Sequence, residues 1–168
     1  MVTKLKIKNY SRGFTIVELL IYMALLSGFL IITTELFASI MDVKLESEAV
    51  SSAEQDGRYI LTRLSHDIPQ SSSITTPNTL GSTATSLVMI VSGVTYTYSV
   101  NGENLQLANN LGTNNLNSTE SKISNVSFQK IGNVGGKETI KLSFTVTSSS
   151  VRNSGPEVRT FNTTVGRR

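Results

Sequence analysis

The pattern of hydrophobic positions divides the chain into three parts. In the first part, residues 14–41, almost every side chain is apolar, and Glu18 and Glu35 are the only charged ones. At a rise of about 1.5 Å per residue this run forms a helix of about 42 Å, which is long enough to cross a hydrocarbon core of about 30 Å. The run is also longer than the apolar core of a signal peptide, and no small-residue cleavage site follows it. We therefore expect a membrane-spanning helix that stays in the mature protein.

The second part, residues 42–69, keeps the helical period but becomes polar on one side. Its apolar face recurs at spacings of three and four residues and comprises Val43, Val50, Ala53, Gly57, Ile60, Leu61, Leu64 and Ile68. The opposite face carries Lys44, Glu48, Gln55, Arg58, Arg63 and Asp67. Because a residue before proline is biased away from the helical region, Pro69 predicts that the helix ends at about Asp67. Gly57 either allows a strand to approach closely or only weakens the helix.

The third part, residues 70–168, changes to the period of two that is typical of strands. Residues 70–86 are rich in Ser and Thr and predict a surface loop. Six strands are predicted after it, at residues 87–91, 94–100, 105–107, 126–128, 140–146 and 158–165. Asn101-Gly102 predicts a hairpin with a type I′ turn. We expect an α+β fold in which a long N-terminal helix packs on an antiparallel β-sheet head.

Composition excludes several classes of function. The chain has no cysteine and a single histidine, His66, so a disulfide framework, a thiol nucleophile and a histidine-cluster metal site are not expected. Of the 15 basic residues, the four before residue 14 leave 11 against 12 acidic ones, so no basic surface for direct nucleic-acid binding is indicated. His66 adjoins Asp67, but no nucleophile is placed beside the pair. We expect no enzyme, no cofactor and no metal.

Charge also predicts orientation. Lys4, Lys6, Lys8 and Arg12 precede the apolar run and acidic residues follow it, which places the N-terminus in the cytoplasm and the head outside. Glu18 needs a separate explanation, because a carboxylate at depth costs about 2.5–3.5 kcal/mol on insertion scales. It either lies near the interface and reaches water, or it meets a cation supplied from elsewhere. Glu35 is expected at the outer membrane boundary.

The segment Gly13-Phe14-Thr15-Ile16-Val17-Glu18, between a basic leader and a long apolar helix, resembles the signature of type IV prepilins and type II secretion pseudopilins. The resemblance implies that prepilin peptidase cuts after Gly13 and N-methylates Phe14, and that Glu18 is the assembly residue. Glycine at the cut leaves the backbone unobstructed in a protease cleft. Cleavage creates an α-amino cation on Phe14, which can pair with Glu18 of a neighbouring subunit in a low-dielectric surrounding.

The resemblance further implies a cleaved leader (1–13), a transmembrane and assembly helix (14–41), an amphipathic half-helix (42–69) and a β-rich head (70–168). Its partners would be prepilin peptidase, other pilin or pseudopilin subunits, an inner-membrane assembly platform and the lipid bilayer. The layout after Met41 is similar to J-type minor pseudopilins, and the lack of cysteine favours a minor subunit. The implied filament belongs to a type IV pilus (fimbrium), a type II protein-secretion machine or a competence machine for DNA uptake.

Two alternatives stay open. A single-pass membrane-anchored binding protein that never polymerises would share the apolar helix and the head, and an anchored enzyme is a more distant third. An ordinary anchor would tolerate the change Glu18→Gln, whereas a filament subunit would lose assembly.

Overall fold

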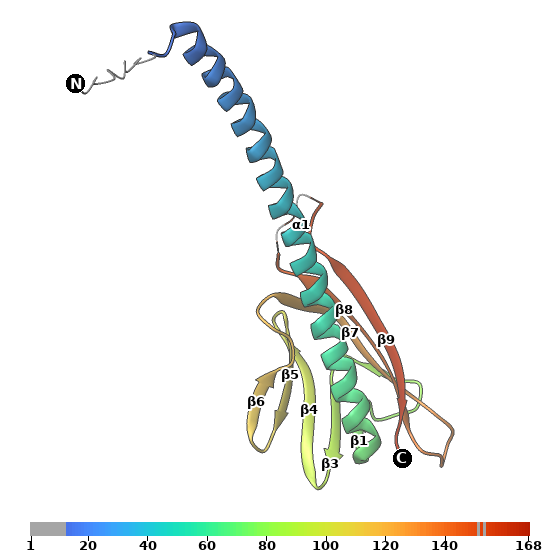
Figure 1. Cartoon of the computed structure of the whole chain (residues 1–168). Coiled ribbons are helices and arrows are strands. Elements are labelled where there is room, and N and C mark those ends of the chain that lie inside the picture. The colour runs from blue at the N-terminus through green and yellow to red at the C-terminus, as the bar shows by residue number, and fades with distance from the viewer. Residues whose placement is uncertain (1–12, 151, 153) are drawn as a thin grey trace, which may run out of the picture. The chain divides into compact units, whose positions relative to one another are not determined.

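The computed structural model describes residues 13–150, 152 and 154–168 (Figure 1). Within these residues the chain forms one helix followed by nine strands. Their bounds are α1 (Ile16–Gln70), β1 (Ser71–Thr76), β2 (Thr83–Ala84), β3 (Leu87–Val91), β4 (Val94–Asn101), β5 (Asn104–Asn109), β6 (Gly112–Asn115), β7 (Ser121–Ile131), β8 (Thr139–Ser148) and β9 (Val158–Gly166). The predicted α+β class, with a long N-terminal helix and antiparallel strands, is confirmed.

The chain divides between Met41 and Asp42 into two compact units, and α1 contributes residues to both. In the first unit the large apolar side chains of α1 are exposed throughout. The most apolar window of α1 has a mean hydropathy of 2.3 and no buried residue. Among the described residues, α1 is thus one helix that is long and apolar enough to cross a membrane.

The second unit, Asp42–Arg168, contains two antiparallel sheets. One sheet has the strand order β1-β3-β4-β5-β6 and the other the order β2-β7-β8-β9. All six predicted strands are confirmed, as β3, β4, β5, β7, β8 and β9. The prediction of a loop over residues 70–86 was wrong in part, because β1 and β2 lie there. The high Ser and Thr content of β1 indicated a loop and not a strand. In the structure β1 pairs with β3 and buries Ile74.

The hairpin at Asn101-Gly102 is confirmed, but its turn differs from the predicted one. Asn101 pairs with Asn104, so the two residues of the loop are Gly102 and Glu103. Gly102 has a φ of 62° and Asn101 keeps a negative φ, which excludes a type I′ turn over Asn101-Gly102. Two consecutive positive φ angles occur instead at Ser92 and Gly93, in the turn between β3 and β4.

The second half of α1 completes the core of the head. Its buried apolar side chains join those of both sheets in one cluster, to which α1 contributes Ala53, Ile60, Leu64 and Ile68. Two assignments from the helical pattern were wrong: Val43 is 66% exposed, and Asp67, predicted on the polar face, is only 2% exposed. Val43 lies before the point at which the strands begin to cover the helix, and Asp67 is buried because it has partners on α1 and β4.

α1 ends three residues later than predicted. Pro69 lies inside the last turn, where its fixed φ is compatible with a helix and only one hydrogen bond is lost. The Ser71 hydroxyl donates to the Ile68 carbonyl at 2.7 Å and satisfies one of the free carbonyls of the helix end. β1 therefore follows α1 without an intervening loop.

Candidate processing and assembly site

The predicted processing and assembly residues surround the first turn of α1. Thr15 precedes the helix and caps it, because its hydroxyl accepts a hydrogen bond of 3.2 Å from the Glu18 N–H. The Leu19 N–H donates to the Thr15 carbonyl at 3.1 Å. Glu18 is thus the third residue of the helix, where a negative charge is favoured by the helix dipole. The pattern Thr-x-x-Glu at 15–18 is a capping signal that the sequence reading did not use.

Glu18 has a second local partner. The Tyr22 hydroxyl, one turn further along α1, donates to Glu18 Oε1 at 3.2 Å. The Tyr22 ring also contacts Phe14 edge to face, with ring centroids 6.0 Å apart. Phe14, Glu18 and Tyr22 therefore form a column along one side of the helix start. Glu18 is half-buried by these neighbours.

The segment ahead of this column is open. A Cβ atom added at Gly13 would have no atom within 4 Å, and Phe14 is 73% exposed. Among residues 13–150, 152 and 154–168, nothing covers the Gly13–Phe14 peptide bond, which lies just before the start of α1. The basic leader, with Lys4, Lys6, Lys8 and Arg12, lies outside the described residues.

Glu35 is the second carboxylate of the apolar run, and it differs from Glu18 in its surroundings. It lies in the interior of α1, is exposed, and is flanked by exposed apolar side chains such as Leu36 and Phe37. The nearby hydroxyls of Thr33 and Thr34 bond to the Phe29 and Leu30 carbonyls at 2.8 Å. Glu35 therefore makes a matched comparison for Glu18: the same charge, on the same helix, away from the helix start.

A second polar cluster lies in the head around Asp67, which the sequence placed on the polar face. Asp67 Oδ2 accepts from the Tyr98 hydroxyl at 2.5 Å and from Arg63 Nε at 2.8 Å. His66 Nδ1 lies 2.9 Å from Asp67 Oδ1, and His66 Nε2 lies 2.9 Å from the Gln70 amide nitrogen. Burial, together with the Asp67 carboxylate, raises the pKa of the Tyr98 hydroxyl. The cluster joins α1 to β4 through a buried carboxylate.

A further carboxylate holds the loop after β6. Asp56 Oδ2 accepts from the Ser118 N–H at 2.9 Å and from the Ser121 hydroxyl at 2.5 Å. Beside it, Asn117 is buried, and its side chain accepts from the Leu105 N–H at 3.0 Å. Among the described residues, no three His, Cys, Asp or Glu side chains gather into a group that could hold a metal ion.

Comparisons of the chain with models of protein families, with characterised proteins and with solved structures return no match. The functional reading consequently depends on the residues themselves, and above all on the column at the start of α1.

Proposed function

We propose that this chain is a non-enzymatic, membrane-anchored subunit of a filament of the type IV pilus and type II secretion class. It is processed after Gly13 and assembles through the apolar part of α1, and its head lies outside the cytoplasmic membrane. The observation that carries the proposal is the position of Glu18. A half-buried carboxylate stands one turn into an otherwise apolar and exposed helix, directly behind an accessible Gly13–Phe14 bond.

Cleavage at Gly13 would place a new α-amino group at the top of the column formed by Phe14, Glu18 and Tyr22. The Tyr22 hydroxyl occupies one oxygen of the Glu18 carboxylate, and a carboxylate has about four acceptor positions. The Glu18 carboxylate therefore keeps free acceptor positions for a cation from a neighbouring subunit. Where lipid and packed helices exclude water, such a pair is far stronger than in water, and an unpaired carboxylate is costly. Pairing would fix the register between adjacent helices.

The exposed apolar surface of α1 supports the same proposal. From Phe14 to Met41 the large apolar side chains are left exposed by the rest of the described chain, and lipid or other helices would cover them. A bundle of parallel helices in a filament core provides this cover after the subunit leaves the bilayer. A head with its own core remains outside such a bundle.

One observation favours the second candidate, a membrane-anchored binding protein that does not polymerise. Thr15 and Tyr22 already give Glu18 a capping role and a hydrogen bond within the chain. In that case Glu18 only begins the helix near the membrane surface, and no neighbouring cation is needed.

Replacing each carboxylate by its amide tests the proposal. In the native host, Glu18→Gln should reduce the amount of the chain in sheared or purified filaments at least ten-fold, whereas the matched variant Glu35→Gln should leave it unchanged. Intact-mass measurement of the membrane protein should give a chain that begins at N-methylated Phe14 in both variants. Normal filament content in Glu18→Gln, or an uncut leader in the wild type, would refute the proposal.

A further inference from the structure

β9 differs from the other strands that border the two sheets. Most exposed edge strands of β-sheets are short or irregular, because a long and regular edge strand can pair with another chain. β2 has two residues, β6 has four, and β1 pairs with β3 through two register irregularities. β9 instead pairs with β8 over nine consecutive positions without irregularity. Its sequence contains neither lysine nor proline.

The hydrogen bonds at its two ends show which backbone groups of β9 face outward. The Ser148 N–H donates to the Glu157 carbonyl, and the Arg167 N–H donates to the Glu138 carbonyl, both at 2.8 Å. Because inward and outward groups alternate along an antiparallel strand, the odd-numbered residues of β9 bond to β8. The even-numbered residues turn their N–H and C=O groups to the free side: Val158, Thr160, Asn162, Thr164 and Gly166. Among the described residues no strand lies beyond β9 in this sheet.

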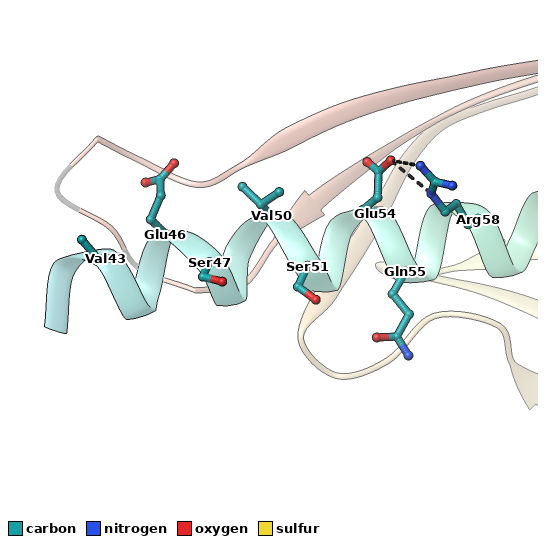
Figure 2. A pocket seen from close by; sticks show the side chains of 8 residues that line it. All are labelled: Val43, Glu46, Ser47, Val50, Ser51, Glu54, Gln55 and Arg58. Carbon is teal, nitrogen blue, oxygen red and sulfur yellow. Dashed lines mark hydrogen bonds and ion pairs between the residues drawn. The ribbon is translucent and has the colours of Figure 1, made fainter. Parts of the chain in front are cut away.

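A groove runs along the flank of α1 on the side of β9. It is lined by Val43, Glu46, Ser47, Val50, Ser51, Glu54, Gln55 and Arg58 (Figure 2). Two contacts place this flank next to β9: Glu54 lies 3.8 Å from Arg159, and Gly57 lies against the Phe161 ring. On another side of α1, Asp67 contacts the first sheet through the Tyr98 hydroxyl of β4. The groove therefore lies where the side chains of a strand next to β9 would point.

The charged side chains of the groove already have partners in the chain. Arg58 bonds to Glu54 at 2.8 Å, as Figure 2 shows, and this bond lowers the pKa of the Glu54 carboxyl. Glu46 pairs with Arg152 at 2.5 Å. The surface left for an occupant is the apolar one around Val43 and Val50. An uncharged strand with aliphatic side chains on alternate positions matches this surface.

We propose that β9 and this groove accept an extended segment of a different protein chain, which adds to the sheet as an antiparallel strand. The backbone of the segment would bond to the five outward residues of β9, and its alternate aliphatic side chains would fill the groove on α1. Backbone pairing supplies the affinity in this mode of recognition, and the side-chain sites supply the specificity. Neither site is complete without the other.

The packing of β9 argues against the β9 strand of a second copy as the occupant. Phe161 and Val165, alternate side chains of β9, already pack against the core of their own head. The β9 strand of a second copy therefore has no free side chains to place in the groove on α1, whereas a segment of a different chain brings its own.

Photo-crosslinking in the native host tests the inference. p-Benzoylphenylalanine replaces Thr160 or Thr164, two outward positions of β9, in the full-length chain. We expect both positions to crosslink to one short segment of one other protein, with the two attachment points about four residues apart and in reverse order. Crosslinks to a second copy of this chain, attachment points in parallel order, or crosslinks scattered over many proteins would overturn the proposal.

A matched pair of variants shows whether crosslinking depends on the free backbone N–H groups of β9. Asn162→Pro removes the central outward N–H without removing a bond to β8, and it should lower both crosslink yields at least ten-fold. Asn162→Ala keeps that N–H and should leave the yields unchanged. Equal yields in the two variants would overturn the proposal.

A second pair of variants tests the groove. Val50→Lys should reduce crosslinking by blocking the groove, while Thr113→Lys on β6 should not.

Two further measurements separate these effects from misfolding and from loss of the anchor. Thermal unfolding of each variant verifies the fold. Carbonate extraction of the same membranes reports the anchoring on its own.

Discussion

Gly57 on α1 and the Phe161 ring on β9 meet so closely that no room is left for a side chain at position 57. A Cβ atom at position 57 would lie 2.2 Å from two carbon atoms of the Phe161 ring. That ring in turn stacks on Phe144, with centroids 5.4 Å apart and an interplanar angle of 18°. Of the two interpretations of Gly57 that the sequence left open, close approach of a strand is the one confirmed.

Gly57→Ala should therefore destabilise the head. The change gains up to about 1 kcal/mol of helix propensity, but the overpacked ring costs about 1–3 kcal/mol. We expect a net fall of several degrees in the unfolding midpoint, measured by circular dichroism in detergent. Gly28→Ala on the same helix is the matched control, because a Cβ there has nothing within 4 Å. Phe161→Leu should recover part of the loss; an unchanged midpoint in Gly57→Ala would show that the ring moves freely.

Tyr98→Phe should destabilise the head by about 1.5–3 kcal/mol, the usual range for a lost hydrogen bond to a charged group. Its hydroxyl donates to a carboxylate that is only 2% exposed, so Asp67 would lose a partner that water cannot easily replace. Tyr96→Phe, two residues earlier on β4 and half-buried, provides the comparison. Urea unfolding of the three proteins measures the difference. Equal midpoints for both variants would mean that Arg63 and His66 suffice for Asp67.

The same hydroxyl predicts a loss of stability at alkaline pH. Burial and the Asp67 carboxylate raise the pKa of Tyr98 in the folded protein above its usual value of about 10. The unfolded chain then loses this proton first, so the contribution of Tyr98 is complete below pH 10 and decreases as the pH rises beyond it. The unfolding midpoint of the wild type should fall more steeply between pH 9.5 and about 11 than that of Tyr98→Phe. Parallel curves would contradict this assignment.

A fragment Asp42–Arg168 should fold and remain soluble, whereas a fragment Ser71–Arg168 should not. The second fragment lacks Ile60, Leu64 and Ile68, which are fully buried among the strands. Burial of each such side chain contributes about 1.5–3 kcal/mol, and the stability of a small domain is only about 5–15 kcal/mol. Thermal circular dichroism of both fragments checks this prediction. A cooperative transition at the same temperature in the shorter one would show that the sheets close their own core.

Periodicity alone determined the elements whose pattern is long and regular. The amphipathic continuation and most of the strands follow from spacings of 3.6 and 2, because each of these elements must turn its apolar side chains one way. The membrane-length helix follows from the length of the apolar run. The expectations at Gly13, Phe14 and Glu18 also came from the sequence alone, through the resemblance of residues 13–18 to the prepilin signature, and they stay predictions. Short polar strands such as β1 and β6 carry no such period, and only pairing with a neighbour makes them strands.

The tertiary structure decided what depends on partners distant in the chain. Asp67 lies on the polar side of the helical pattern, yet it is buried because Tyr98, 31 residues later, donates to it. Gly57 could not be interpreted until Phe161 was found against it. The open edge of β9 beside the groove at Val50 likewise cannot be predicted from the sequence, because the residue type does not indicate whether its backbone N–H and C=O groups pair with another strand. Spacing along the chain determines which way a side chain points, and packing alone determines what it meets there.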